Sequence, residues 1–220
     1  MEIKKFWKFY PKTKNKSHIV ENRSKVSKKI KKKLKNFGKD YFDGKREHGY
    51  GGYFYNSKYF RRVTKEIIKH YKLDNRSKIL DIGCAKGFMM HEFRFFLPKA
   101  EIWGVDISKY CKIKALSKEK KYIKIGSCDK LPFKTNYFDL VISISTIHNL
   151  SEKKIPYAIK ELERVKKKNS FIRVKGYKNL REKTFIDKWN LVAKSNLSIK
   201  KWLIIFKKYK YTGDHQFTNY

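Results

Sequence analysis

The sequence predicts an α/β fold in which helices cover both faces of a mostly parallel β-sheet, giving a three-layer sandwich. Two observations lead to this expectation. Short apolar runs with strand character alternate with amphipathic helical segments between residues 78 and 176. The chain of 220 residues is also long enough to bury the core of one domain and too short for two of ordinary size. We therefore expect a basic N-terminal arm over residues 1–37 and one domain over residues 38–220.

The individual elements follow from apolar periodicity and from turn residues. Residues 58–71 carry apolar side chains at helical spacing and precede a polar turn, so a helix comes before the first strand. In chain order the next elements are a strand at 78–82, a helix at about 87–97, a strand at 101–106, a helix at about 109–119, strands at 122–126 and 138–144, a helix at 152–167 and a strand at 170–176. Residues 181–194 and 198–208 are expected to be helical, and the aromatic segment 209–220 is expected to add a strand.

The chain is strongly basic, with 56 lysines and arginines against 20 aspartates and glutamates and a formal net charge of +36. Such a charge by itself indicates a polyanionic partner, because lysine and arginine neutralise phosphates and release counterions. Only nine of the basic residues are arginine, the side chain best suited to bidentate phosphate recognition, and lysines are spread over most of the predicted helices. This pattern is typical of a solvated surface, so a nucleic-acid partner stays open but is not favoured.

The cysteines and the apolar runs indicate which cellular compartment to expect for the protein. Cys84, Cys111 and Cys128 have none of the paired spacings of a zinc site, and an odd number does not suit a disulfide framework. No stretch approaches the ~18 apolar residues that a membrane-spanning helix needs. The sequence therefore predicts a protein of the reducing cytoplasm with no bound metal and no membrane span.

The first strand ends in a glycine-rich turn. Residues 79–88 read ILDIGCAKGF, an apolar strand that runs through the turn into a helix, where small residues let the backbone approach a ligand. Asp106 closes the second strand about 20 residues later, where a carboxylate can accept both hydroxyls of a ribose. A nicotinamide dinucleotide fingerprint starting at Gly83 would need a small residue where Phe88 stands. The pattern indicates a nucleoside cofactor other than a dinucleotide.

The turn, Asp81-x-Gly83-x-Ala85-x-Gly87, resembles the first motif, D-x-G-x-G-x-G, of class I S-adenosylmethionine (SAM)-dependent methyltransferases, with alanine in place of the middle glycine. Residues 128–133 and 138–143 resemble later segments of the same Rossmann-like, methyltransferase-11-type family, and residues 41–53 resemble a stretch found in an uncharacterised bacterial subgroup. The resemblance implies SAM as cofactor, with the methionine end at Asp81 and Gly83, the ribose at Asp106 and the adenine at Ile107, Cys128 and Asp129. The full set of cofactor-binding residues that we expect is Asp81, Gly83, Cys84, Ala85, Gly87, Asp106, Ile107, Cys128, Asp129 and Ser143.

Two further features are candidates for the acceptor side. His148 follows the fourth strand at the edge where ligands of open α/β sheets bind, and a histidine with a pKa near ~6.5 can take a proton as a general base. The alternative is a hydrogen-bonded wall residue. The loop over residues 43–53 is rich in glycine and tyrosine; Tyr50 and Tyr53 can stack on a ligand, and Arg46 can bind an anionic group. The alternative there is a loop that only packs.

Two sequence features that are absent narrow the class of acceptor that we expect. The segment after the fourth strand, residues 143–146, does not match the Asn/Asp-Pro-Pro-Tyr/Phe motif of amino-methyltransferases that act on adenine or cytosine. The cysteines also lack the setting of a covalent nucleophile. We therefore expect methyl transfer to an oxygen or nitrogen atom of a small-molecule or sugar acceptor. An RNA methyltransferase that uses the lysine-rich arm, or a non-catalytic nucleic-acid-binding protein on this fold, are the alternatives.

Overall fold

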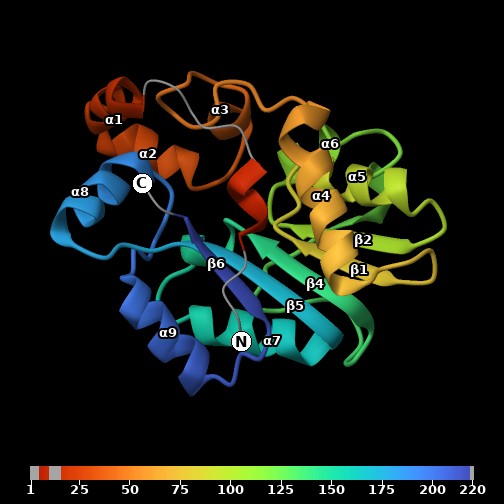
Figure 1. Ribbon diagram of the computed structural model, residues 1–220. Helices are drawn as coiled ribbons and strands as arrows, with labels where there is room; N and C mark the ends of the chain where they lie inside the picture. Colours follow the sequence, from red (N-terminus) through yellow and green to blue (C-terminus); the bar gives the residue numbers. More distant parts are fainter. Residues whose placement is uncertain (1–4, 10–15, 219–220) are drawn as a thin grey trace.

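The computed structural model describes residues 5–9 and 16–218 and confirms the α/β fold class (Figure 1). Its six-stranded sheet has the order β3-β2-β1-β4-β5-β6, and every strand pairing in it is parallel. The strands are β1 (Lys78–Ile82), β2 (Glu101–Asp106), β3 (Ile123–Ile125), β4 (Phe138–Ile144), β5 (Lys166–Lys175) and β6 (Asp214–Thr218). The strand order reverses between β1 and β4, which in open α/β sheets is the place where ligands bind, beyond the carboxyl ends.

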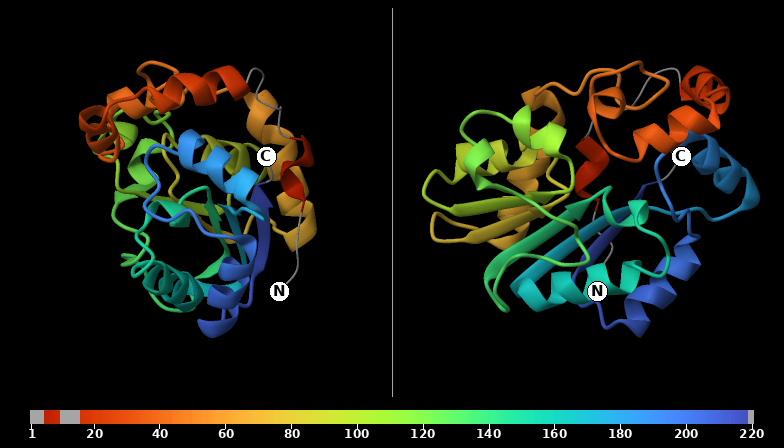
Figure 2. Two further views of the ribbon diagram at one scale, coloured as in Figure 1. Left: turned by 90° about the vertical axis from the view of Figure 1, so that its left-hand side faces the viewer. Right: turned by 180° about the vertical axis from the view of Figure 1, so that it is seen from behind.

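Helices cover both faces of the sheet, as Figures 1 and 2 show. On one face α4 (Ser57–Tyr71) and α5 (Phe88–Phe96) contribute to a core that contains Ile79 of β1. On the other face α7 (Ile155–Val165) and α9 (Ile199–Lys208) pack with Leu80 of β1. Successive strand side chains point to opposite faces, so a strand that is buried on both sides needs the continuous apolar run seen in the sequence. No helix in the described part of the chain is long and apolar enough to cross a membrane.

Several predicted boundaries were wrong, and for the three largest differences a tertiary contact competes with local propensity. The helix expected to reach residue 119 ends earlier, as α6 (Lys109–Ile113), because Glu119 is fully buried and pairs with Arg94 of α5 at 3.2 Å. A short 3₁₀ helix, η2 (Lys120–Tyr122), follows. The strand expected from residue 170 begins at Lys166, which pairs with Phe138 of β4.

The helix expected over residues 181–194 ends at Trp189 as α8 (Leu180–Trp189). Leu191 and Val192 instead leave the helix and are buried against the N-terminal segment. The aromatic C-terminal segment adds a strand as expected, and this strand, β6, forms one edge of the sheet.

The basic N-terminal segment forms the helices α1 (Lys16–Ser24), α2 (Lys28–Leu34) and α3 (Lys39–Phe42), after a 3₁₀ helix, η1 (Phe6–Phe9). Together with α8 these helices lie beyond the carboxyl ends of the strands (Figure 1). Leu34 is buried against Leu191 and Val192, and Arg23 is buried and donates from Nη1 to the carbonyl of Trp189 at 2.6 Å. The described part of the predicted arm is therefore packed on the domain; residues 1–4 and 10–15 lie outside the described residues.

This packing predicts a specific effect of shortening Leu34. We expect Leu34→Ala to speed tryptic cleavage within α2 at least tenfold, because removing a buried leucine side chain costs about 2–5 kcal/mol and local opening exposes the lysines. Limited proteolysis followed by mass spectrometry measures the rate. Asn36→Ala, at an exposed position just after the same helix, is the control, because it leaves every tryptic site of α2 in place. Equal cleavage of wild type and Leu34→Ala would mean that α2 is not held by this contact.

Candidate cofactor and acceptor site

The turn after β1 has a backbone that only glycine accommodates at Gly83. Its φ is +80°, in the left-handed region, and a Cβ atom there would collide with the side chain of Thr146. The amides of Gly83 and Cys84 donate to the carbonyl of Val105 on β2, at 2.7 and 3.3 Å. The turn is thus fixed between β1 and β2, and the side chain of Thr146 packs directly against its backbone.

Two buried carboxylates face this turn. Asp106 ends β2, where it accepts the amides of Ala85 and Ser108, both at 2.8 Å. Burial raises the pKa of Asp106, although these hydrogen bonds oppose the shift. Burial and the nearby Asp106 raise the pKa of Asp81 to about 7. No lysine or arginine in the described part of the chain forms an ion pair with Asp81 or Asp106, so a cationic ligand would stabilise their charge.

A cavity of about 1450 Å³ opens at this edge of the sheet. It is larger than the roughly 300–1,000 Å³ of most single-ligand pockets and so has room for a cofactor and a second molecule. The predicted residues that line it are Asp81, Gly83, Cys84, Ala85, Asp106, Ile107, Cys128, Arg46, Tyr50, Tyr53 and His148. The structure therefore brings most of the predicted site residues together around one space.

Three predicted cofactor residues do not line the cavity. Gly87 precedes α5 with a φ of +78° and lies against Glu119. Ser143 is fully buried within β4. Asp129 forms an ion pair with Lys154 at 2.9 Å, and that lysine does line the cavity. Direct contact of these three residues with a cofactor stays a prediction.

A buried ion pair that the sequence did not point to joins the glycine- and tyrosine-rich loop to the cofactor turn. Lys86, in the middle of the turn motif, contacts both carboxylate oxygens of Asp43, at 2.8 and 2.7 Å, and donates to the carbonyl of Tyr53 at 2.7 Å. Asp43 also accepts the hydroxyl of Tyr110 at 2.6 Å. Burial raises the pKa of Asp43, but the bonds from Lys86 and Tyr110 outweigh it and leave this pKa below the usual value. The one sequence feature that could have pointed to this ion pair is the position of Lys86, a charged residue between Ala85 and Gly87 of the turn.

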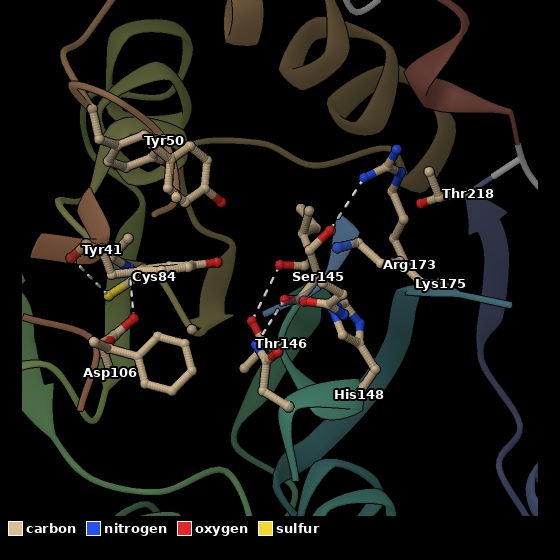
Figure 3. A pocket seen from close by; sticks show the side chains of 18 of the residues that line it. Tyr41, Tyr50, Cys84, Asp106, Ser145, Thr146, His148, Arg173, Lys175 and Thr218 are labelled. Atoms are coloured by element: carbon tan, nitrogen blue, oxygen red, sulfur yellow. Dashed lines mark hydrogen bonds between the residues drawn. The ribbon is translucent and has the colours of Figure 1, made fainter. Parts of the chain in front are cut away.

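Aromatic side chains of the same loop build one wall of the cavity. Tyr50 stacks on Phe42 with ring centroids 5.7 Å apart, and Tyr53 stacks on Phe88 at 4.7 Å. Figure 3 shows Tyr50 on the same side of the cavity as Cys84 and Asp106. Burial raises the pKa of the Cys84 thiol well above its usual value, which fits a spacer and not a nucleophile.

Arg46 is held within its own loop. Its guanidinium donates to the carbonyl of Gly49 and lies 5.9 Å from the ring centroid of Trp189. It lines the cavity in this position, and its contact with an anionic group of the acceptor stays a prediction.

The opposite end of the cavity is polar and basic. His148, on η3 (Ile147–Asn149), is 2% exposed, and its Nδ1 has no hydrogen-bond partner among the described residues. Burial, with Lys175 and Arg173 nearby, holds the pKa of His148 well below its ordinary value. The imidazole is therefore neutral at pH 7 and has a nitrogen that can accept a proton. Sequence reasoning missed Arg173 and Lys175, although both are polar residues at the end of a predicted strand.

A family model described as a methyltransferase domain matches residues 80–174. These residues form a class I SAM-dependent methyltransferase domain. The family implies SAM as the ligand of this domain. The two buried carboxylates at Asp81 and Asp106, which line the cavity, fit a cofactor that carries ribose hydroxyls and a positive charge. No group of three or more His, Cys, Asp or Glu residues in the described chain is arranged to hold a metal ion.

The methyltransferase domain has curated relatives. The malonyl-[acyl-carrier protein] O-methyltransferase of Legionella pneumophila is 35% identical over 115 residues, 47% of this chain and 39% of that protein. The tRNA (carboxymethyluridine(34)-5-O)-methyltransferase of Arabidopsis thaliana is 29% identical over 150 residues, 60% of this chain and 36% of that protein. The alignments thus span well under half of these relatives.

Solved structures share the fold. The YcgJ protein of Bacillus subtilis superposes with a TM-score of 0.56 at 22% identity, over 66% of each chain. At this identity the likeness concerns the fold of the methyltransferase domain and not its acceptor.

The ribose assignment predicts the effect of removing the carboxylate at the end of β2. We expect Asp106→Ala to weaken SAM binding at least tenfold, because a charge-assisted hydrogen bond contributes about 1.5–3 kcal/mol. Isothermal titration calorimetry measures the affinity. Asp139→Ala is the control, because Asp139 accepts the Lys78 amide at the start of β1, far from the turn. Unchanged SAM affinity in Asp106→Ala would exclude the ribose contact.

The buried ion pair predicts a loss of stability that depends on the remaining partner. Lys86→Met leaves Asp43 buried without its cation, so we expect the free energy of unfolding to fall by about 3 kcal/mol. The double variant Lys86→Met/Asp43→Asn should recover part of this loss, because no uncompensated charge remains. Urea denaturation measures each value, with Lys58→Met as a control at the cavity rim. No recovery in the double variant would contradict this account.

The same pair sets a pH dependence. Because the pKa of folded Asp43 lies below its unfolded value of 3.8, its contribution is fully present above about pH 5 and is lost as the pH falls through the folded pKa.

Proposed function

We propose that the protein transfers the methyl group of SAM to an oxygen or nitrogen atom of a small-molecule or sugar acceptor. The observation that carries this proposal is a single cavity with the methyltransferase turn at one end and a neutral, buried histidine at the other. Figure 3 shows the two ends, with Asp106 and Cys84 opposite His148 and Ser145. A cofactor and an acceptor that share this cavity would be held in the proximity that the reaction needs.

The N-terminal elements support a small acceptor. Trp7 of η1, Arg23 of α1 and Trp189 of α8 all line the cavity, so segments far apart in sequence enclose its acceptor end. Arg23 connects them, because it donates to the carbonyls of Trp189 and Gly49. A site that is partly covered in this way limits the size of what can enter.

An RNA acceptor is the second candidate. The lysines of α2 include exposed ones such as Lys29, Lys32 and Lys33, and a curated relative is named as a tRNA methyltransferase. A turnover assay with labelled SAM against pooled metabolites, nucleotide sugars and RNA distinguishes the two. RNA turnover that falls steeply with salt would favour the second candidate.

In this proposal the cofactor provides the methyl group, and residues of the chain provide orientation, shielding from water and removal of a proton. When bound, SAM would supply an electrophilic methyl group for transfer to a lone pair of the acceptor. The turn at Gly83 and the carboxylate of Asp106 would hold the cofactor, and the loop around Tyr50 and Tyr53 would shield it from water. His148 takes the proton that the acceptor oxygen or nitrogen releases. Its unpaired Nδ1 and neutral state suit this role.

This role predicts a separation of binding from turnover. We expect His148→Ala to keep its SAM affinity and to lower kcat by roughly 10²–10⁴, the range for a positioned proton acceptor. Because its pKa is lowered, His148 stays neutral between pH 6.5 and 8, and the wild-type rate should show no His148 titration there. Steady-state kinetics with the identified acceptor measures both effects, with the exposed His18→Ala as control. A higher KM with unchanged kcat would instead make His148 a wall residue.

A further inference from the structure

The acceptor end of the cavity carries a polar patch on one face of two neighbouring strands. Arg173 and Lys175 flank the fully buried Val174 on β5, so their side chains share the opposite face. The parallel register places Gln216 of β6 beside Arg173 and Thr218 beside Lys175. All four polar residues line the cavity. Figure 3 shows Arg173, Lys175 and Thr218 together on the side away from Asp106.

This patch begins where the apolar cover of the same face ends. Phe171, two residues before Arg173, is buried beneath Phe6 and Trp7 of η1, with ring centroids at 5.1 and 6.2 Å. Arg173 lies over the ring of Trp7, 4.8 Å from its centroid, and donates from Nη1 to Ser145 Oγ at 3.3 Å. Its guanidinium is thus held in one orientation at the cavity wall.

Lys175 is placed in the cavity without a counter-charge. Trp202 fixes its backbone by donating to the Lys175 carbonyl at 2.9 Å, while its ammonium has no hydrogen bond or ion pair within residues 5–9 and 16–218. The charged or titratable groups near it are Arg23 of α1, Arg173 of β5 and His148 of η3. Burial and the two arginines lower the pKa of Lys175 to about 7.

The negatively charged side chains of the cavity lie at one end. The carboxylates that line it, within the described chain, are Asp81 and Asp106, and both lie at the cofactor turn. Two buried polar atoms at the other end, Thr218 Oγ1 and His148 Nδ1, have no hydrogen-bond partner among the described residues. Buried polar atoms are nearly always paired, so unpaired ones around a cavity point to a ligand.

We propose that Lys175 and Arg173 bind an oxyanion of the acceptor, a phosphate or a carboxylate, at the carboxyl ends of β5 and β6. The inference rests on the proposed methyl transfer for its role, because it makes the acceptor an anionic small molecule. A guanidinium and an ammonium are the groups that bind such oxyanions, and Thr218 can donate a further hydrogen bond. The bound anion turns the acceptor so that its uncharged, reacting part faces the cofactor turn.

Binding of an anion at this site is expected to be accompanied by the uptake of a proton from solvent by Lys175. Lys175 is partly deprotonated in the free protein near pH 7, and a neighbouring anion stabilises its charged form, so its pKa rises on binding. At pH 8 we expect nearly one proton to be taken up per anion bound. Neither a surface lysine nor a structural role would produce this uptake.

The experiment is isothermal titration calorimetry on protein saturated with S-adenosylhomocysteine, which fills the cofactor end and its carboxylate contacts. Inorganic phosphate and succinate are titrated separately at pH 8 in buffers of different ionisation heat. We expect Lys175→Met to weaken the binding of the preferred anion at least tenfold and to abolish proton uptake. Lys175→Arg should restore binding without uptake, because arginine is already charged. Tighter binding of phosphate or of succinate identifies the source of the oxyanion.

Lys178→Met is the matched control, because Lys178 is an exposed lysine that lines the same cavity. Equal losses in Lys175→Met and Lys178→Met would show that surface charge alone attracts the anion and would overturn the proposal. A loss of S-adenosylhomocysteine affinity in Lys175→Met would overturn it too, since Lys175 would then bind the cofactor. Failure of the wild type to bind S-adenosylhomocysteine counts against the proposed methyl transfer instead, and the anion titration can still be made on the free protein.

Discussion

The buried ion pair between Asp43 and Lys86 is the constraint that joins the two halves of the site. Lys86 belongs to the turn that follows β1, whereas Asp43 begins the loop that carries Tyr50 and Tyr53. Either charge would destabilise the fold without its partner, because both side chains are largely buried. The position of the loop is therefore coupled to the shape of the cofactor turn, and the aromatic wall of the cavity depends on this coupling.

The cavity is also organised by charge. Two carboxylates with raised pKa values lie at the turn, and Arg173 and Lys175 lie at the far end. Charges in a poorly solvated space interact more strongly than at a surface, so this division favours one orientation of a ligand pair. A positively charged cofactor at Asp81 and an anionic acceptor at Lys175 would each remove an uncompensated charge.

In the lysine-rich N-terminal segment, composition predicts which residues are exposed but not which residues pack on the domain. Lysines such as Lys32 point to solvent, as the sequence suggested, but Arg23 and Leu34 point inward and hold the segment on α8. Composition alone describes the outer face of such a segment. Its inner face depends on a few residues that contact α8 and the loop after α3.

The sequence by itself determined the strands β1, β2 and β4 to the residue, because strands buried on both faces leave continuous apolar runs. It also determined the cofactor turn, since the left-handed backbone at Gly83 needs a glycine within a local motif. Only the tertiary structure decided the pairing of Lys86 with Asp43 and the patch around Lys175. These contacts join residues far apart in the chain, and their geometry comes from sheet register and loop packing, which leave no local pattern in the sequence.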